Sequence, residues 1–171
     1  MSRKIVVIRH GKAEGHAALD LDRVLAPRGR EDSTRLGAWL GSRDLGVQDL
    51  GSRARVYVSA AARAKQTWDR VSPGLADLDV EVDVTDRLYD AGTDVVLELV
   101  ARTSEDVSTV FIVGHNPTMA DLVRALPNDG SPARDAFARR GFPTAACAIV
   151  ECRAWHDPRG VISAFVTPDD Y

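Results

Sequence analysis

Two histidines and two arginines lie at or just after the ends of short apolar runs of strand length. The first run ends in Arg9-His10-Gly11, a second is followed by Ser59-Ala60-Ala61-Ala62-Arg63, and a later one ends in Gly114-His115-Asn116-Pro117. A planar guanidinium can bind two oxygens of a phosphoryl group at once. Together these residue types predict a site that binds a phosphoryl dianion.

The elements that must position these residues follow from the hydrophobic pattern, in which strand-length apolar runs alternate with amphipathic segments of helix length. The predicted strands are Lys4–Arg9, Arg55–Ser59, Val80–Val84, Thr109–Gly114, Ala145–Cys152 and Val161–Val166, and the predicted helices are Pro27–Gly41, Ala61–Val71, Thr93–Thr103 and Pro117–Leu126. Strands joined by helical crossovers pair in parallel, whereas the last two strands should form a hairpin across a turn-rich segment. We therefore expect a single domain over residues 1–171, an α/β sandwich with a mostly parallel, mixed sheet flanked by helices.

Such a sheet would bring the three motifs to one place, because ligands of open α/β sheets bind at the carboxyl ends of the parallel strands. Asn116 followed by Pro117 predicts an N-cap and a first helical residue, so the amino end of a helix would face the same edge. Two segments without a predicted element, Gly11–Ala26 and Asn128–Pro143, are long enough to suggest a functional role. His16 lies in the first of them and could reach the phosphoryl group.

The composition argues against several classes of partner. The chain has 171 residues, a formal net charge of −3 and no long run of lysine or arginine, which disfavours nucleic acid or an anionic membrane as the main partner. No apolar stretch approaches the length of a membrane span, and the first apolar run is too short for the core of a signal peptide. We expect a cytoplasmic monomer that binds neither nucleic acid nor a membrane.

The two cysteines, Cys147 and Cys152, lie five residues apart in one predicted strand. Side chains at an odd spacing in a strand point to opposite faces of the sheet, so these two cannot pair with each other. We expect two buried thiols, as is typical of a reducing compartment.

The motifs also resemble those of a known family. The arginine-histidine-glycine triplet, the segment from Ser59 through Arg63 with Gln66-Thr67, and Gly114-His115-Asn116-Pro117 look like the three signatures of the histidine phosphatase superfamily, in its phosphoglycerate mutase-like branch. The short chain and three further segments look most like the SixA-type phosphohistidine phosphatases; these segments are Asp22–Gly29, Leu88-Tyr89 and Phe142–Ala145. The resemblance extends from residue 4 to about residue 166.

The resemblance implies a phosphoglycerate mutase-like fold and a role for each signature residue. His10 would be the nucleophile, Arg9 and Arg63 would bind phosphate, and His115 would be the second catalytic histidine. The substrate-binding residues would then be Arg9, Arg63, His115, Gly11, Asn116 and His16.

The chain departs from the family at two positions. Ala26 stands where many relatives have a threonine that can cap the following helix. Asp90 stands where mutase-like members carry a glutamate that acts as the general acid, so we assign that catalytic role to Asp90, with Asp20 and Asp22 as alternatives. The shortage of acids fits a labile phosphoramidate substrate.

The predicted activity is that of a phosphatase that forms a phosphohistidine at His10 and acts on phosphohistidine in a protein. Two alternatives remain open: a phosphatase of a small phosphate ester, and a module that binds phosphate or a phosphoprotein without turnover. No cofactor or metal is required by this chemistry, and the Walker, HExxH and CxxC patterns are absent from the sequence. A metal site built from His10, His16 and His115 is the remotest alternative.

Overall fold

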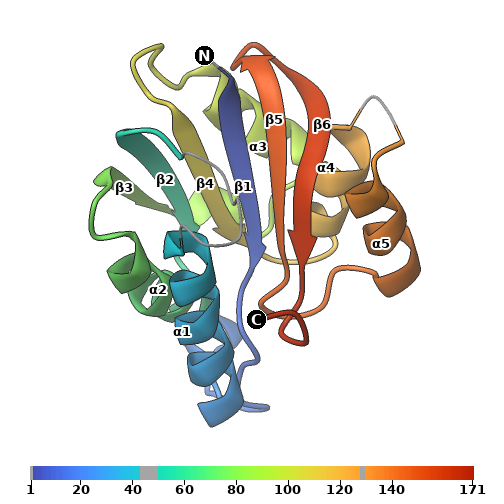
Figure 1. Cartoon of the computed structure of the whole chain (residues 1–171). Helices are drawn as coiled ribbons and strands as arrows, with labels where there is room; N and C mark the ends of the chain where they lie inside the picture. The colour runs from blue at the N-terminus through green and yellow to red at the C-terminus, as the bar shows by residue number, and fades with distance from the viewer. Residues whose placement is uncertain (1, 43–49, 128–129) are drawn as a thin grey trace.

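The computed structural model describes residues 2–42, 50–127 and 130–171. Its centre is a six-stranded sheet with the strand order β3-β2-β4-β1-β5-β6 (Figure 1). The strands are β1 (Arg3–Arg9), β2 (Arg53–Ser59), β3 (Asp79–Thr85), β4 (Thr109–Gly114), β5 (Cys147–Ala154) and β6 (Asp157–Val166). The helices are α1 (Pro27–Gly41), α2 (Ala62–Val71), α3 (Thr93–Ala101), α4 (Thr118–Ala125) and α5 (Pro132–Arg140), with short 3-10 turns at Asp20–Asp22, Ser72–Leu75 and Asp86–Leu88.

The sheet is mixed and mostly parallel, as the sequence predicts. Strand β1 is parallel to β4, β4 to β2, and β2 to β3, whereas β5 pairs antiparallel with both β1 and β6. Strands β5 and β6 form the expected hairpin, with Trp155 and His156 in its turn. The α/β fold predicted from the alternation of strand and helix patterns is thereby confirmed.

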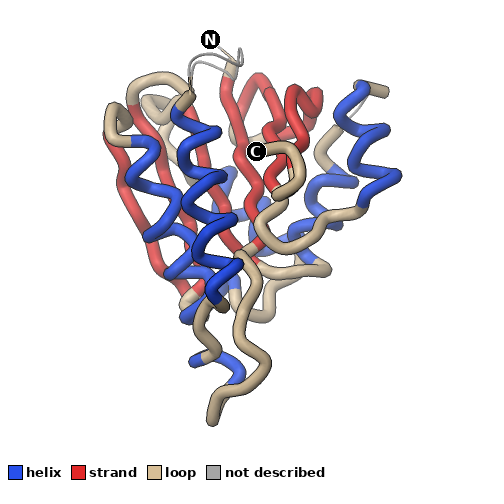
Figure 2. The backbone as a smooth tube through the Cα atoms, turned by 60° about the horizontal axis from the view of Figure 1, so that its bottom comes forward, coloured by secondary structure: helices blue, strands red, loops and turns tan. Residues whose placement is uncertain are grey.

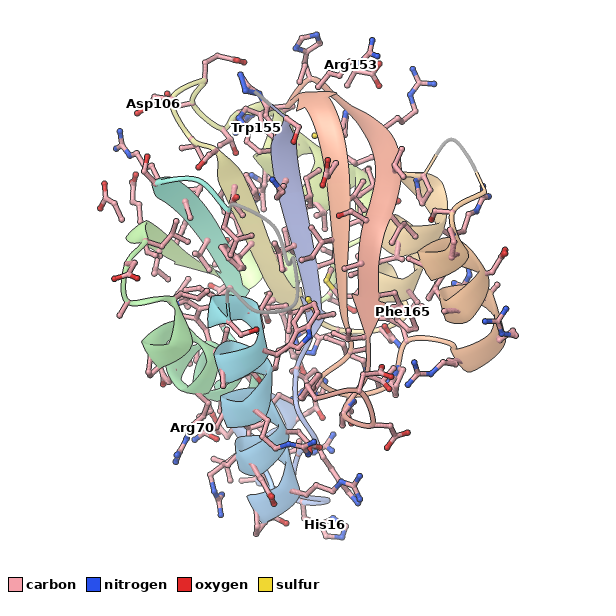
Figure 3. All side chains as sticks on the ribbon, viewed as in Figure 1. His16, Arg70, Asp106, Arg153, Trp155 and Phe165 are labelled. Atoms are coloured by element: carbon pink, nitrogen blue, oxygen red, sulfur yellow. The ribbon has the colours of Figure 1, made fainter. Side chains whose placement is uncertain are left out.

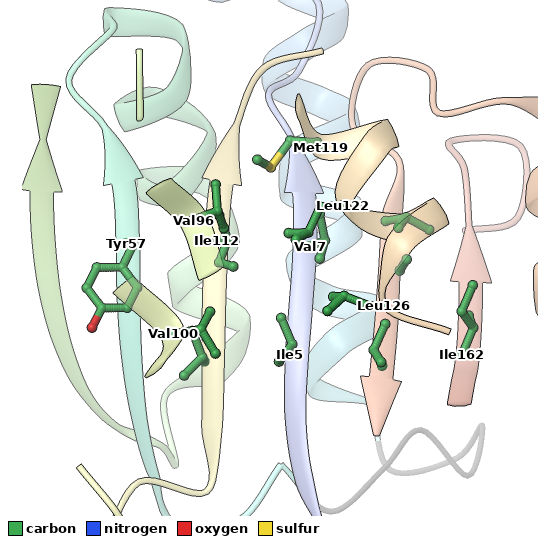
Figure 4. Packing of buried hydrophobic residues seen from close by; sticks show 14 of the residues in the cluster. Ile5, Val7, Tyr57, Val96, Val100, Ile112, Met119, Leu122, Leu126 and Ile162 are labelled. Atoms are coloured by element: carbon green, nitrogen blue, oxygen red, sulfur yellow. The ribbon is translucent and has the colours of Figure 1, made fainter. Parts of the chain in front are cut away.

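Both faces of the sheet are buried at its central strands β1 and β4. Along β1, Ile5 and Val7 belong to one hydrophobic cluster, and the residues between and after them, Val6 and Ile8, belong to the other. The first cluster includes residues of α3 and α4 (Figure 4) and Phe137 of α5, and the second lies under α1 and α2. Because both faces are covered, the central strands are continuously apolar and their polar ends stand out clearly in the sequence.

The two cysteines confirm the alternation in β5. Cys147 packs in the cluster under α1 and α2, and Cys152 packs in the cluster on the opposite face. Both thiols are free and buried, and burial raises the pKa of each. Within the described residues, no helix is both long enough and apolar enough to span a membrane.

Two predictions about elements are wrong. The segment Asn128–Pro143 is not a loop throughout, because α5 occupies Pro132–Arg140 (residues 128–129 lie outside the described chain). Its start has a recognisable signal, since the Ser131 side chain accepts a hydrogen bond from the N–H of Arg134 at 3.2 Å and Pro132 occupies the first turn. Only Phe137 of this helix is fully buried, so its apolar pattern is too weak to indicate a helix.

The second error concerns the start of α4. Pro117 is the N-cap of α4 and Thr118 its first residue, so Asn116 is not the N-cap. The Oδ1 atom of Asn116 nevertheless accepts a hydrogen bond from the N–H of Ala120 at 3.3 Å. The side chain therefore still satisfies one free donor in the first turn of the helix.

Candidate active site

The carboxyl ends of β1, β2 and β4 meet at one edge of the sheet. Arg9 is in register with Gly114, and Val58 with Val113, so the residues that follow these strands come together. The rings of His10 and His115 lie with their centroids 5.0 Å apart and their planes inclined at 56°. The convergence expected from the sequence is therefore present in the structure.

His10 lies at the bottom of this site and is 9% exposed. Its N–H donates to the carbonyl of Gly114 at 3.0 Å, and its ring Nδ1 lies 2.7 Å from the carbonyl oxygen of Gly11. A carbonyl only accepts, so Nδ1 carries the proton and Nε2 is left with a free lone pair. Burial lowers the pKa of His10 to about 3, and the neighbouring His115, Arg63 and Arg9 act in the same direction.

His115 is oriented by Ser59, the last residue of β2. The Nε2 atom of His115 lies 2.8 Å from the Ser59 hydroxyl oxygen, which also accepts a hydrogen bond from the N–H of Ala61 at 3.3 Å. A hydroxyl has one proton and two acceptor lone pairs, so the Ser59 contact fixes the orientation of the His115 ring and is compatible with a ring proton on either nitrogen. Within the described residues the Nδ1 atom of His115 is buried and has no hydrogen-bond partner. Burial, followed by the charge of Arg63, lowers the pKa of His115 to about 4.

The two arginines approach the histidine pair from different elements. Arg9 ends β1 and donates from Nη1 to the carbonyl of Phe142 at 3.1 Å, while its buried Nε has no partner within the described chain. Arg63 lies in the first turn of α2 and is 7% exposed. Thr67 connects this turn to Gly11, the residue after His10. Its hydroxyl accepts a hydrogen bond from the N–H of Gly11 at 2.9 Å and donates one to the carbonyl of Arg63 at 2.7 Å.

Asp20 contacts the guanidinium of Arg63 at two points. Nη1 of Arg63 donates to the Asp20 carbonyl at 2.8 Å, and Nη2 donates to the Asp20 carboxylate at 2.9 Å. The same carboxylate accepts from the hydroxyl of Tyr89 at 2.6 Å and from Arg23 Nη1 at 2.9 Å. The hydrogen bonds from Tyr89, Arg23 and Arg63 hold the pKa of Asp20 well below its usual range, so this carboxyl is ionised.

Tyr89 is a site residue that the sequence reasoning did not assign. Its ring meets that of His115 edge to face, with the centroids 5.7 Å apart, and the guanidinium carbon of Arg63 lies 6.0 Å from the Tyr89 ring centre. The only signal for it was the Leu88-Tyr89 pair that contributed to the family resemblance. Its neighbour Asp90 is exposed.

The segment that carries Asp20 projects beyond the edge of the sheet (Figure 2). It is attached at its base, where Leu25 N–H donates to the Gln66 side chain at 2.8 Å and Ala26 N–H donates to the Lys12 carbonyl at 2.9 Å. Ala26 is the N-cap of α1 and forms no side-chain capping bond, as expected from the missing threonine. The start of α1 is therefore held by the hydrogen bonds of Leu25 and Ala26 at the base of the 11–26 segment, and not by a capping side chain.

The structure does not bring every predicted residue to the histidine pair. His16 is exposed at the far end of the 11–26 segment (Figure 3), and within the described chain it has no hydrogen bond or ring contact with the site. Asp90 and Asp22 are exposed and, in the same described part, form no contact with either histidine. Asn116 donates from Nδ2 to the Phe142 carbonyl at 2.8 Å, the oxygen that Arg9 also contacts. Asn116 thus helps to position the Phe142 carbonyl to which Arg9 donates.

Comparisons with known proteins identify the family of this chain. The model of the histidine phosphatase superfamily (branch 1) matches residues 5–93. The phosphohistidine phosphatase SixA of Escherichia coli is 32% identical over 151 residues, which are 86% of this chain and 84% of that protein. An uncharacterised protein of Mycobacterium tuberculosis is 32% identical over 165 residues, 93% of this chain and 96% of its own length.

Solved structures show the same likeness over nearly the whole chain. A putative phosphohistidine phosphatase SixA from Nakamurella superposes with a TM-score of 0.77 at 30% identity, covering 98% of this chain and 95% of that one. The protein histidine phosphatase SixA complexed with tungstate superposes with a TM-score of 0.76 at 27% identity, covering 98% of each chain. A phosphoglycerate mutase from Plasmodium falciparum shares the fold at 16% identity, with a TM-score of 0.51 and coverage of 97% of this chain and 89% of its own.

Proposed function

Because this chain belongs to branch 1 of the histidine phosphatase superfamily, we propose that it is a phosphatase that transfers a phosphoryl group to His10 and then to water. The observation that carries the proposal is the hydrogen bond from His10 Nδ1 to the Gly11 carbonyl at 2.7 Å. This bond leaves Nε2 unprotonated and directs the ring toward His115 and the two arginines. A neutral imidazole in that position is a competent nucleophile at neutral pH.

In the first step, the lone pair of His10 Nε2 forms a bond to phosphorus while the bond from phosphorus to the leaving group breaks. We assign the ring proton of His115 to its buried Nδ1, so that the nonbridging oxygens are held by Arg9, Arg63 and this N–H. Two of the atoms assigned this role, Arg9 Nε and His115 Nδ1, are buried and lack partners within the described residues. Buried polar atoms are costly when unpaired, so donors left free in this way favour binding of an acceptor such as a phosphoryl oxygen.

In the second step, water attacks phosphorus, the bond to His10 breaks, and inorganic phosphate and neutral His10 are released. The hydrogen bond from Nδ1 to the Gly11 carbonyl supports this cycle. Phosphorylation at Nε2 makes the ring electron-poor, and the carbonyl dipole stabilises the Nδ1–H of that ring. No step requires a metal or a cofactor.

The choice of substrate follows from the acids at the site. Expulsion of an alkoxide typically gains about 10² to 10⁴ in rate from a positioned general acid. Asp20 is held ionised by its three donors, and Asp90 is exposed and away from the histidine pair, so neither is suited to donate a proton. The imidazole of phosphohistidine is a better leaving group and needs less protonation. We propose protein phosphohistidine as the substrate, which agrees with the activity named for the E. coli relative.

Side-by-side kinetics test this assignment. We expect a higher kcat/KM for a phosphohistidine peptide than for the matching phosphoserine peptide, by about the 10² that a missing general acid costs an ester. A preference for the phosphoserine peptide would contradict the substrate assignment and leave the His10 chemistry intact. Absence of phosphate release from either peptide would contradict the enzymatic function and favour a binding module.

A further inference from the structure

We propose that Asp20 determines specificity by favouring substrates whose leaving group is cationic or donates an N–H, and by disfavouring anionic leaving groups. This inference rests on the proposed phosphatase function. It assigns to Asp20 a role different from that of the acid that the sequence suggested. Its basis is the position of the carboxylate, its remaining hydrogen-bonding capacity and its exposure.

The position of Asp20 is on the exit side of the site. Displacement at phosphorus is in line, so the leaving group departs on the side opposite His10, away from the sheet. The 11–26 segment is the part of the chain that projects beyond that edge (Figure 2), and Asp20 lies in its 3-10 turn. Asp20 is bonded to both Arg63 and Tyr89, and the Tyr89 ring contacts His115, so the Asp20 carboxylate lies beside the site on this side.

The carboxylate is held in one orientation. Its Oδ2 accepts from Arg63 at 2.9 Å and from Tyr89 at 2.6 Å, and its Oδ1 accepts from Arg23 at 2.9 Å. The Asp20 backbone carbonyl adds a fourth contact, again with Arg63. Because these contacts fix the carboxylate, it presents the same geometry to every leaving group. Such a fixed group can discriminate between leaving groups.

The carboxylate still has capacity for one ligand. Two carboxylate oxygens offer about four lone-pair sites, and three of them are used by the donors named above. The Asp20 side chain is 50% exposed, so an approaching group can reach the carboxylate. An ionised carboxylate only accepts, so it can bind an imidazole N–H or an ammonium group and repels a carboxylate.

The test uses two phosphohistidine peptides of equal length in which the phosphohistidine is flanked either by lysine or by glutamate. The reacting atoms are identical, so the ratio of the two kcat/KM values reports only the charge around the leaving group. We expect the wild-type protein to prefer the lysine peptide and Asp20→Asn to reduce that ratio roughly fivefold. If Asp20→Asn also weakens phosphoryl binding through Arg63, both peptides are affected equally, and this effect cancels in the ratio of the two kcat/KM values.

Asp22→Asn is the matched control. Asp22 lies in the same 3-10 turn, is exposed, and within the described residues makes no contact with Arg63. Its substitution removes the same charge and should leave the ratio within about twofold of wild type, since exposed charges at longer range are screened. An unchanged ratio in Asp20→Asn, or an equal shift in Asp22→Asn, would overturn the role of Asp20. No turnover of either peptide by the wild-type protein would instead overturn the phosphatase function.

Discussion

His10 differs from a surface histidine in two respects that act together. Burial and three neighbouring positive or partly positive groups lower its pKa to about 3, so the ring is neutral throughout the physiological range. The Gly11 carbonyl then determines which nitrogen carries the proton. A nucleophile needs both conditions, because a neutral ring in the other tautomer would present an N–H to the phosphorus.

Arg63 should depend on its shape as well as its charge. Its guanidinium is fixed from one side by Asp20, and its planar fork can hold two oxygens. Arg63→Lys keeps the charge and loses the fork, so we expect kcat/KM to fall on the order of 10², as for loss of one preorganised donor. Kinetics near wild type would remove Arg63 from the phosphoryl site, and Lys65→Arg on the exposed side of the same helix is the control.

At the scale of elements, the first turn of α1 is in close backbone contact with Gly11 and Lys12, the two residues that follow His10. A Cβ atom on Gly11 would lie 2.7 Å from the Gly29 carbonyl oxygen, and a Cβ atom on Gly29 would lie 2.1 Å from the Lys12 carbonyl oxygen. Both distances are shorter than van der Waals contact with rigid backbone. The first turn of α1 therefore sets the position of the turn whose Gly11 carbonyl orients His10.

Gly29→Ala should test this contact. The added methyl would push α1 away from Lys12, and we expect a loss of about 1 to 3 kcal/mol in the free energy of unfolding, despite the better helix propensity of alanine. The displaced Gly11 carbonyl should also lower kcat. Gly15→Ala is the control, because a Cβ atom there meets nothing within 4 Å. Denaturant titration and kinetics of both variants measure the two effects, and equal behaviour would contradict the account.

The elements that the sequence predicts best are those with strong periodicity. The central strands and α1 to α3 were predicted within a few residues because each is apolar on the faces it buries. Helix α5 was missed because it buries little, although Ser131 and Pro132 marked its start. At the site, the residues next to strand ends were predictable, whereas Tyr89 and the contact between Asp20 and Arg63 depend on how a long loop folds back. Local patterns carry no information about such a contact.

For the whole molecule, the buried histidine couples the site to acid stability. The pKa of His10 is about 3 in the folded chain against 6.5 for the free side chain. Below pH 6.5 the unfolded chain therefore binds a proton that the folded chain does not, so the free energy of unfolding falls as the pH falls toward 3. Between pH 7 and 5 this one group costs about 2 kcal/mol.

His10→Gln removes this titration. When the pH is lowered from 7 to 5, the free energy of unfolding of His10→Gln should therefore fall by about 2 kcal/mol less than that of the wild type. Urea unfolding at both pH values measures the difference. His156→Gln, at an exposed position in the β5–β6 turn, should behave as wild type does. Parallel losses in His10→Gln and wild type would show that His10 is not held neutral by the fold.

The central claim is that phosphorus passes through a bond to His10 Nε2. Mass spectrometry of the protein, quenched at alkaline pH during turnover of a phosphohistidine peptide, tests it most directly, because phosphohistidine survives such a quench. We expect an added phosphoryl group on His10, attached at Nε2, and no adduct in His10→Ala. A phosphoryl group on His115 or on any other residue, or phosphate release by His10→Ala at the wild-type rate, would contradict it.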